Sequence, residues 1–259
     1  MRAVGASRWS YLDGPTPFGL AHRGAHGPGV PENTMVAFEA AVTLGYRYVE
    51  TDVHATADGV LVAFHDDTLD RVTDRTGRIA DLPWAQVREA SVGGSATIPL
   101  LEDVLGTWPQ LRLNIDVKED SGVGPTLEVL ARTQAYRRVC IGSFSQRRTR
   151  ALRAALPPGT ATAYAPGEVA LLRSSTRRPR MGARLPRDVP CVQVPRRHRG
   201  VTIVDEGFVA AAHSRGCQVH VWTINEEAEM RRLLALGVDA IVTDEARLLR
   251  DVLTAGPAP

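Results

Sequence analysis

Residues 21–70 read AHRGAHGPGVPENTMVAFEAAVTLGYRYVETDVHATADGVLVAFHDDTLD. The β-branched run at 48–53 predicts a strand, and alternate side chains of a strand share a face, so Glu50 and Asp52 point the same way. Two carboxylates on one face raise each other's proton affinity unless a cation lies between them. His54 shares this face but lies beyond the pair, where a turn is expected.

Histidines lie on both sides of this carboxylate pair in the sequence. His22 and Arg23 follow a short apolar run that predicts a first strand. A turn at 58–59 and a second strand at 60–64 lead to His65. Two imidazoles, a guanidinium and two carboxylates in one stretch form a set of groups suited to phosphate chemistry.

The rest of the chain alternates predicted strands with segments of helical periodicity. Eight such strands in 259 residues favour an α/β protein with a (β/α)8 TIM barrel over a doubly wound sheet. The expected strands are 18–22, 48–53, 111–118, 138–142, 161–164, 191–194, 218–223 and 240–242.

Polar side chains come at the carboxyl ends of these expected strands. His22 ends the first strand, Asp116 and Lys118 end the third, Gln193 ends the sixth and Trp222 the seventh. Active sites of such barrels lie at the carboxyl ends of the strands, so the sequence predicts one functional rim. Gln193 is a candidate to contact substrate there, and Trp222 suits either the core or a wall of the site.

The domain organisation follows from changes in periodicity. Residues 1–17 show none and are expected to form an N-terminal arm, whereas 18–259 form the barrel. Residues 66–98 are rich in Asp, Arg, Thr and Gly, with one helical piece at 84–88. We expect them to form a small insertion after the second strand, above the main body.

Composition narrows the class of protein. Hydrophobic residues make up 44% of the chain, which is ordinary for a globular protein, and there is no apolar run long enough to span a membrane. The first residues lack the apolar core of a signal peptide, so we expect a cytoplasmic protein. Cys140, Cys191 and Cys217 are few and widely spaced, which favours buried free thiols over disulfides or a cysteine metal site.

The basic residues are unevenly divided between the two types. Lys118 is the single lysine against thirty arginines, a mild indication that an ammonium group is needed there. The arginine-rich section 173–199 has no interleaved aromatic residues and no apolar helical face. It is expected to be a solvated loop, with neither nucleic acid nor an inserted membrane segment as partner.

Short motifs occur in a fixed order along about residues 18–250. They are His-Arg-Gly at 22–24, Pro-Glu-Asn-Thr at 31–34, Glu-Thr-Asp-Val at 50–53, His-Asp at 65–66, Ile-Pro-Leu-Leu-Glu at 98–102, Asn-Ile-Asp-Val-Lys at 114–118, Ser-Phe-Ser at 143–145, Val-Trp-Thr-Ile-Asn at 221–225 and Gly-Val-Asp-Ala-Ile-Val-Thr-Asp at 237–244. With this set the chain resembles the glycerophosphodiester phosphodiesterases, a family of the phosphatidylinositol-phospholipase-C-like barrel superfamily.

The resemblance implies a metal-dependent phosphodiesterase that hydrolyses small glycerophosphodiesters to sn-glycerol 3-phosphate and an alcohol. It implies one divalent cation, Mg²⁺ or Ca²⁺, and it matches 66–98 to the family's small insertion. The implied roles are metal ligation by Glu50, Asp52 and Asp116, acid–base catalysis by His22 and His65, and phosphate binding by Arg23 and Lys118.

Two positions depart from the family pattern. Asp116 stands where the family usually has Glu, so the ligand is one methylene shorter and an ion could shift toward the third strand or take a bridging water. Glu245 and Ala246 follow the terminal Thr-Asp where a Pro is usual, which is expected to affect only local geometry.

Two other functions stay open at this point. A lysophospholipase D-like enzyme would need an apolar groove at the barrel mouth, whereas Arg23 and the run 196–199 suggest a polar rim. A catalytically silent phosphodiester-binding barrel would be expected to lack a histidine or a metal ligand, and both kinds of residue are present. The attacking group, water or a neighbouring hydroxyl of the substrate, and the oligomeric state stay open as well.

Overall fold

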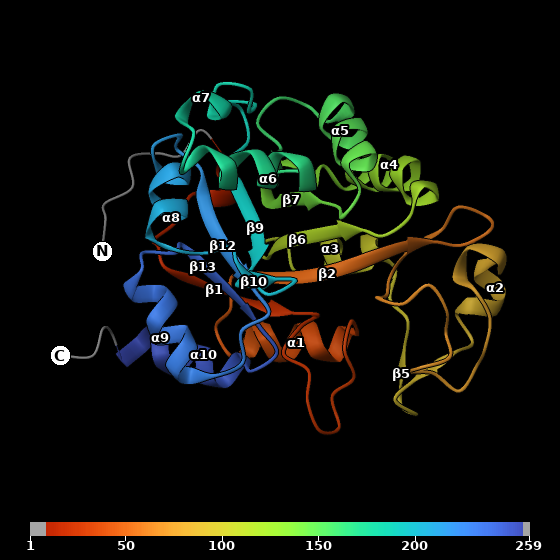
Figure 1. Ribbon diagram of the computed structural model, residues 1–259. Coiled ribbons are helices and arrows are strands. Elements are labelled where there is room, and N and C mark those ends of the chain that lie inside the picture. Colours follow the sequence, from red (N-terminus) through yellow and green to blue (C-terminus); the bar gives the residue numbers. More distant parts are fainter. Residues whose placement is uncertain (1–8, 256–259) are drawn as a thin grey trace.

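The computed structural model describes residues 9–255 and confirms the predicted TIM barrel (Figure 1). Among these residues, eight parallel strands follow one another around the barrel in the order β1, β2, β6, β7, β8, β9, β12, β13, and β13 pairs with β1. A single parallel bridge between Ala163 and Cys191 joins the β8 side to β9, so the barrel is most weakly paired there. The strands are β1 (Phe18–His22), β2 (Tyr48–Ala55), β6 (Arg112–Val117), β7 (Val139–Gly142), β8 (Ala161–Thr162), β9 (Cys191–Pro195), β12 (Gln218–Trp222) and β13 (Ala240–Thr243).

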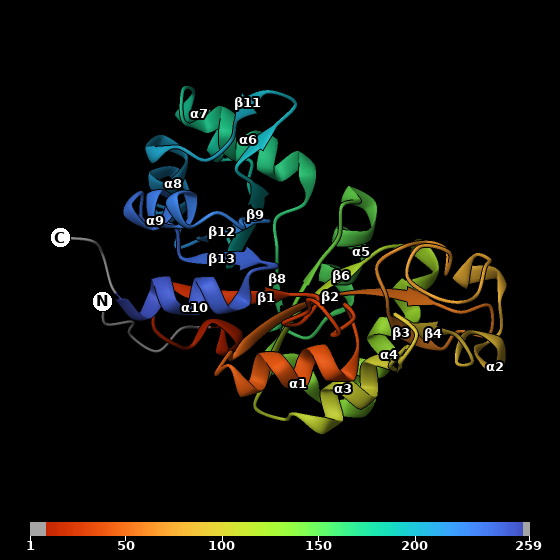
Figure 2. The same ribbon diagram turned by 90° about the horizontal axis from the view of Figure 1, so that it is seen from below.

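Helices cover the outside of the strands, with α1 and α3 on one side and α6 and α8 on the other in Figure 2. Several begin where the sequence offers a side-chain cap: Thr34, Ser145 and Asp205 each accept a hydrogen bond from the backbone N–H three residues on. The covering helices are α1 (Met35–Thr43), α3 (Leu101–Thr107), α4 (Val123–Thr133), α5 (Gln146–Ala155), α6 (Pro166–Ser175), α8 (Glu206–His213), α9 (Glu227–Ala235) and α10 (Ala246–Ala255).

Strand β6 illustrates how the alternating pattern places the site. Leu113, Ile115 and Val117 are buried in the apolar cluster that the strands share with α3 and α4. Asn114 and Asp116 alternate with them and therefore lie on the opposite face of the strand, toward the barrel interior. Polar side chains of the barrel strands reach the interior by the same alternation.

The segment between β2 and α3 forms a lobe at the right of Figure 1, beyond the end of β2. Strand β3 (Leu61–Ala63) pairs antiparallel with β2 after a turn in which Gly59 has a φ of +81°. The lobe then contains η2 (Ile79–Asp81), α2 (Trp84–Val87), β4 (Ser91–Val92) and β5 (Ala96–Thr97). Leu69, Val87 and neighbouring apolar residues form a separate buried cluster beneath it.

Residues 1–8 of the expected N-terminal arm lie outside the described residues. After them, η1 (Ser10–Leu12) brings Tyr11 to a fully buried position beside the start of β2. The hydroxyl of Tyr48 donates to the carbonyl of Tyr11 over 3.0 Å, and the two rings meet edge to face. This element covers the end of the barrel at which the strands begin.

The arginine-rich section is more regular than expected. It contains a short helix, α7 (Pro179–Gly182), and ends in β10 (Arg197–His198), which forms a hairpin with the following β11 (Val201–Thr202). The two-residue strands are too short for a periodicity to predict them. Within the described part of the chain, no helix is long and apolar enough to cross a membrane.

Candidate active site

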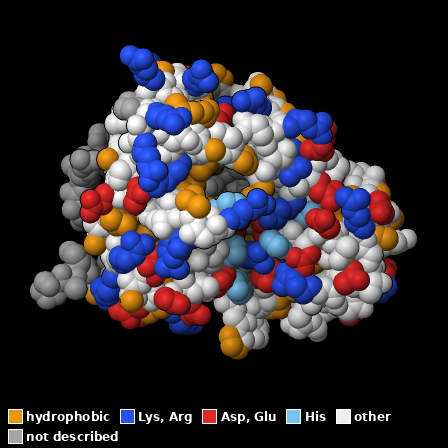
Figure 3. Space-filling model, in the orientation of Figure 1, with side chains coloured by type: hydrophobic (Ala, Val, Ile, Leu, Met, Phe, Trp, Pro, Cys, Tyr) orange, Lys and Arg blue, Asp and Glu red, His pale blue; other side chains and the backbone are white. Residues whose placement is uncertain are grey.

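The strand register brings the predicted site residues to one end of the barrel. His22 is paired with Glu50 across β1 and β2, and Asp52 is paired with Asp116 across β2 and β6. Because these strands are parallel, their last residues share one rim. Figure 3 shows histidine and basic side chains gathered around a hollow near the middle of this face.

Lys118 lies between two of the predicted metal ligands. Its Nζ is 2.6 Å from Asp52 Oδ1 and 2.8 Å from Asp116 Oδ2. Burial alone would raise the pKa of Asp52, but the ammonium group of Lys118 and the guanidinium of Arg23 outweigh it and lower that pKa. Asn33 supports the same carboxylate by donating from Nδ2 to Asp52 Oδ2 over 3.2 Å. Carboxylates from β2 and β6 thus lie on either side of one cationic group, the ammonium of Lys118.

Glu50 lacks a comparable partner. Burial, and then the charge of Asp52, raise the pKa of Glu50 to about 8. The backbone N–H of Arg23 donates to Glu50 Oε2 over 3.2 Å, and His22 Nε2 lies 3.7 Å from the same oxygen. A buried carboxylate with a pKa this high holds a proton near neutrality unless more positive charge is supplied.

The residues present fit a divalent cation. Asp116 Oδ1 is buried and has no hydrogen-bond partner among the described residues, and burial raises the pKa of this carboxyl despite Lys118. Asp116 thus has an oxygen without a partner, and the nearby Glu50 carboxylate needs positive charge to stay ionised. A hard cation, which binds oxygen ligands, would meet both needs. Glu50, Asp52 and Asp116 could therefore hold such an ion.

His22 is oriented by a residue to which the sequence analysis gave no role. Its Nδ1 donates to Asp244 Oδ1 over 2.6 Å. Asn225 donates from Nδ2 to Asp244 Oδ2 over 2.7 Å, and its own Oδ1 accepts from the backbone N–H of Asp244 over 3.0 Å. His26 Nε2 lies 3.1 Å from Asp244 Oδ1. Asn225 and Asp244 each end a sequence motif, and those motifs were the only available signal.

His22 itself is more basic than a free imidazole. Burial would lower its pKa, but the charges of Glu50 and Asp244 and the hydrogen bond to Asp244 raise it. The same hydrogen bonds hold the pKa of Asp244 well below its usual range against the effect of burial. His22 and Asp244 therefore form a carboxylate–imidazole pair in which Nε2 of the imidazole is on the side of Glu50, 3.7 Å from Oε2.

His65 also has a carboxylate at its Nδ1 nitrogen. Its Nδ1 lies 2.5 Å from Asp66 Oδ1, and Arg71 Nε donates to the other oxygen of Asp66 over 2.5 Å. Arg71 Nη2 also donates to Glu32 Oε1 over 2.6 Å. Glu32 in turn accepts from Arg23 Nη1 over 2.9 Å. A chain of alternating charges thus links the segment of His65 to that of Arg23.

Arg23 occupies a backbone conformation that few side chains adopt. Its φ is +54°, and that of the next residue, Gly24, is +84°. A Cβ on Gly24 would lie 2.7 Å from the backbone carbon of Ala37, so only glycine fits here. Arg23 Nε lies 3.3 Å from Asp52 Oδ2 but is not aligned for a hydrogen bond.

The two remaining candidates lie apart from the charged groups. Gln193 Nε2 donates to Asn114 Oδ1 over 2.7 Å, inside the barrel. Trp222 meets Phe144 edge to face, with ring centroids 5.4 Å apart. Phe144 is 63% exposed, and Lys118 Nζ lies 5.6 Å from its ring centroid. The sequence analysis singled out Phe144 only as part of a motif.

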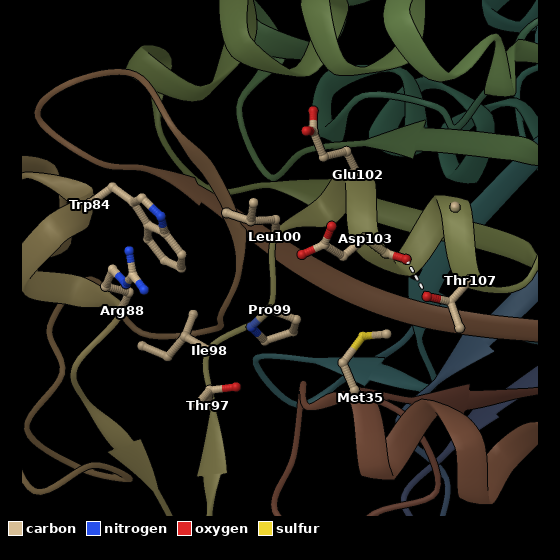
Figure 4. A pocket seen from close by; sticks show the side chains of 11 residues that line it. Met35, Trp84, Arg88, Thr97, Ile98, Pro99, Leu100, Glu102, Asp103 and Thr107 are labelled. Carbon is tan, nitrogen blue, oxygen red and sulfur yellow. Dashed lines mark hydrogen bonds between the residues drawn. The ribbon is translucent and has the colours of Figure 1, made fainter.

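A cavity of about 810 Å³ lies away from these residues, between the lobe and the helices α1 and α3 (Figure 4). Trp84 in α2 and Arg88 directly after it reach toward the cavity, as does Asp103 from α3. None of the predicted site residues lines it. The predicted site residues thus gather at the rim and not in this cavity.

Comparison with known proteins agrees with the fold and with the family resemblance of the motifs. Residues 22–248 match the "Glycerophosphoryl diester phosphodiesterase family". The chain is 44% identical over 241 residues to "Probable glycerophosphodiester phosphodiesterase 2" of Mycobacterium tuberculosis, covering 91% of this chain and 90% of that protein. It is 31% identical over 241 residues to a glycerophosphodiester phosphodiesterase of Bacillus altitudinis, covering 87% and 93%.

A solved structure extends the comparison to three dimensions. A phosphodiesterase of Oleispira antarctica, solved with the product sn-glycerol-3-phosphate, aligns with a TM-score of 0.75 and 25% identity over 92% of this chain and 97% of that one. The fold is thus shared with a solved phosphodiesterase. The chain belongs to the glycerophosphoryl diester phosphodiesterase family and has glycerophosphodiester phosphodiesterase activity. The family that its motifs predicted is thus confirmed.

Proposed function

We propose that this chain hydrolyses glycerophosphodiesters to sn-glycerol 3-phosphate and an alcohol, with His22 and His65 as the acid–base pair. One observation carries the proposal: each imidazole is bound through Nδ1 to a carboxylate, Asp244 at 2.6 Å and Asp66 at 2.5 Å. Such bonds fix the tautomer and leave Nε2 for proton transfer.

A phosphodiester needs positive charge on its non-bridging oxygens, because the anion repels an attacking oxygen. Arg23 and Lys118 are the cationic side chains nearest the carboxylates. A guanidinium can bind two oxygens at once, whereas the ammonium acts as a compact point charge. We assign both to phosphate binding. The ammonium group of Lys118 can replace one of its two carboxylate partners with a phosphate oxygen while it stays at the rim.

We assign Glu50, Asp52 and Asp116 as the ligands of one divalent cation, Mg²⁺ or Ca²⁺. When bound, it supplies a Lewis acid for the phosphate oxygens. Support comes from the orphaned Oδ1 of Asp116 and from the proton-binding state of Glu50. Asp116 would be the ligand contributed by β6, with a side chain one methylene shorter than the glutamate usual in the family.

The two imidazoles divide the proton transfers. One accepts the proton of the attacking hydroxyl while the other donates a proton to the departing alkoxide. His22 lies on β1 and His65 follows β3, so they approach the rim from different segments. Proton uptake and release are therefore assigned to groups on different segments of the chain.

The aromatic pair at the mouth favours a second candidate substrate. Phe144, 63% exposed, and Trp222 offer an apolar surface beside Lys118, where the alcohol portion would leave the phosphate. A lysophospholipid is the substrate that such a surface would favour over a small head group. The arginines of the β10–β11 hairpin make the neighbouring surface polar, so small glycerophosphodiesters rank first.

Hydrolysis by metal-stripped protein tests both candidates. EDTA-treated protein is supplied with Mg²⁺, Ca²⁺ or Mn²⁺ and assayed on glycerophosphocholine, glycerophosphoethanolamine and lysophosphatidylcholine. Glycerol 3-phosphate released from the first two substrates only in the presence of metal is the expected result. Turnover of lysophosphatidylcholine alone would show that the substrate is a lysophospholipid and not a small glycerophosphodiester. No turnover of any substrate by folded, metal-supplied protein would refute the proposal.

The variant Asp116→Asn separates ligation from folding. Replacing a carboxylate ligand with an amide is expected to raise the metal concentration needed for half-maximal turnover. Asp120→Asn is the matched control, because Asp120 is an exposed carboxylate that pairs with Arg148 on the surface. An unchanged metal requirement in Asp116→Asn would remove this residue from the ligand set.

A further inference from the structure

A second group of potential metal ligands lies outside the carboxylate set of the rim. His54 on β2, Asp67 at the start of the lobe and Glu119 after β6 bring one nitrogen and two carboxylate oxygens within 4.8 Å of one another. The three residues come from separate segments of the chain. The sequence pattern predicted that His54 would lie in a turn. In the structure it lies within β2, and its side chain is fully buried.

The hydrogen bonds of His54 leave one ring nitrogen available. Its Nε2 lies 3.1 Å from the carbonyl oxygen of His65, which can only accept, so Nε2 carries the proton in the neutral ring. Nδ1 then presents a lone pair. That atom is buried and has no hydrogen-bond partner among the described residues.

The lone pair of His54 points toward a carboxylate that it cannot bind directly. Nδ1 lies 3.9 Å from Glu119 Oε1, too far for a hydrogen bond, and both atoms are acceptors. A metal ion lies about 2.0–2.2 Å from nitrogen and oxygen ligands, so two ligands of one ion can be up to roughly 4 Å apart. The spacing therefore suits an ion between the two atoms.

We propose that His54, Asp67 and Glu119 bind a second divalent cation, of the Mn²⁺ or Zn²⁺ class. Imidazole nitrogen favours these ions over Mg²⁺ and Ca²⁺, which prefer oxygen ligands. His54 follows Asp52 by two residues on the same face of β2, so the new site lies about 7 Å further along the strand. It shares no ligand with the carboxylate set assigned to catalysis.

Arg78 is the group that such an ion must displace. Its Nη2 lies 2.8 Å from Glu119 Oε1, while its own side chain is 51% exposed. An ion pair with so exposed a partner is weak, because water screens it and the long side chain loses freedom. Asp67 is exposed, so its carboxylate can turn toward an ion without disrupting the core.

The ion would join three parts of the active-site rim. Asp67 follows His65 by two residues, Glu119 follows Lys118, and His54 holds the carbonyl of His65. Binding there would tie the start of the lobe to the end of β6. The site is thus positioned to order the segment that carries His65, without contact with the reacting phosphate.

Metal counting tests this site independently of activity. The background variant Glu50→Gln with Asp116→Asn removes two of the assigned catalytic ligands, and equilibrium dialysis against Mn²⁺ then measures what is still bound. We expect this background to retain one bound Mn²⁺. Adding Glu119→Gln or His54→Gln should weaken Mn²⁺ binding further. Loss of a residue that only supports a metal ligand costs roughly 10- to 100-fold in affinity, so loss of a ligand itself should cost at least as much.

Two further substitutions sharpen the result. Arg78→Gln removes the competing cation and should tighten Mn²⁺ binding, whereas Asp120→Asn, beside Glu119, should leave it unchanged. Circular dichroism checks that each variant folds, and Glu119→Gln keeps the test decisive if the buried His54→Gln does not fold. Equal Mn²⁺ binding with and without Glu119→Gln, or none in the background, would overturn the proposal while leaving the hydrolase assignment intact.

Discussion

Asp244→Asn is the substitution most informative about the mechanism. Asp244 accepts from His22 Nδ1 over 2.6 Å and from Asn225 Nδ2 over 2.7 Å. An asparagine that keeps its amide oxygen toward Asn225 must turn its NH₂ toward His22. Nδ1 of His22 then becomes an acceptor, so the proton moves to Nε2 and the imidazole presents the opposite tautomer to the substrate.

The expected loss follows from two contributions. A hydrogen bond to a charged group contributes about 1.5–3 kcal/mol, or roughly 10- to 150-fold in rate if it is strengthened in the transition state. Loss of a correctly protonated general acid or base costs roughly 10²–10⁴-fold. We therefore expect kcat to fall at least about 100-fold. The folded fraction should be unchanged, because Asn is isosteric with Asp.

Steady-state hydrolysis of glycerophosphocholine across pH measures this effect. Asp244 helps to raise the pKa of His22, so the limb of the pH profile that belongs to His22 should move to lower pH in the variant. His26→Gln is the control: His26 contacts the same Asp244 oxygen at 3.1 Å but is not assigned to proton transfer. A kcat within threefold of wild type and an unmoved pH profile in Asp244→Asn would refute the role of the pair.

Further predictions concern catalysis, backbone strain, packing and pH. His65→Ala is expected to lower turnover by roughly 10²–10⁴-fold with an unchanged circular dichroism spectrum, and near wild-type turnover would exclude His65 from the mechanism. Gly24→Ala should lose about 1–3 kcal/mol of unfolding free energy in urea, because its φ of +84° and the 2.7 Å approach to Ala37 leave no room for a Cβ, and full stability would contradict that. Tyr11→Ala should lose about 3–5 kcal/mol of unfolding free energy because the ring is fully buried, whereas Tyr11→Phe should lose none, since the hydroxyl has no hydrogen-bond partner among the described residues. The pKa of Glu50 is about 8 in the fold against 4.5 for a free glutamate side chain, so its contribution to stability is present below pH 4.5 and lost as pH rises through 8. Metal-free Glu50→Gln should therefore gain stability over the metal-free parent between pH 5 and 8, as thermal melts would show, and a constant difference across that range would contradict it.

Much of the barrel could be predicted because its signals are local. For example, apolar Leu113, Ile115 and Val117 alternate with polar neighbours, which is the pattern of a strand with one apolar and one polar face. The two-residue strands of the lobe and of the arginine-rich section could not be predicted, since neither periodicity nor propensity is measurable over two residues. The domain division proposed from the sequence stays a prediction.

The site residues were accessible from the sequence only one at a time. Strand positions indicated that His22, Glu50 and Asp116 would share a rim, since parallel strands end together. The pairing of His22 with Asp244 joins residues 222 positions apart, and no local pattern encodes such a contact. Burial is equally invisible, which is why His54 was expected in a turn.

The amino-acid sequence by itself determined the order of the eight barrel strands, the family and the identities of the groups at the rim, because these depend on side-chain periodicity and on motifs within a few residues. Tertiary structure alone decided which oxygen faces which nitrogen. Closing the barrel placed Lys118 between Asp52 and Asp116, left Glu50 with a pKa of about 8, and brought Asp244 to Nδ1 of His22. Those outcomes depend on distances of a few ångströms and on exclusion of water, which arise only when distant segments pack together.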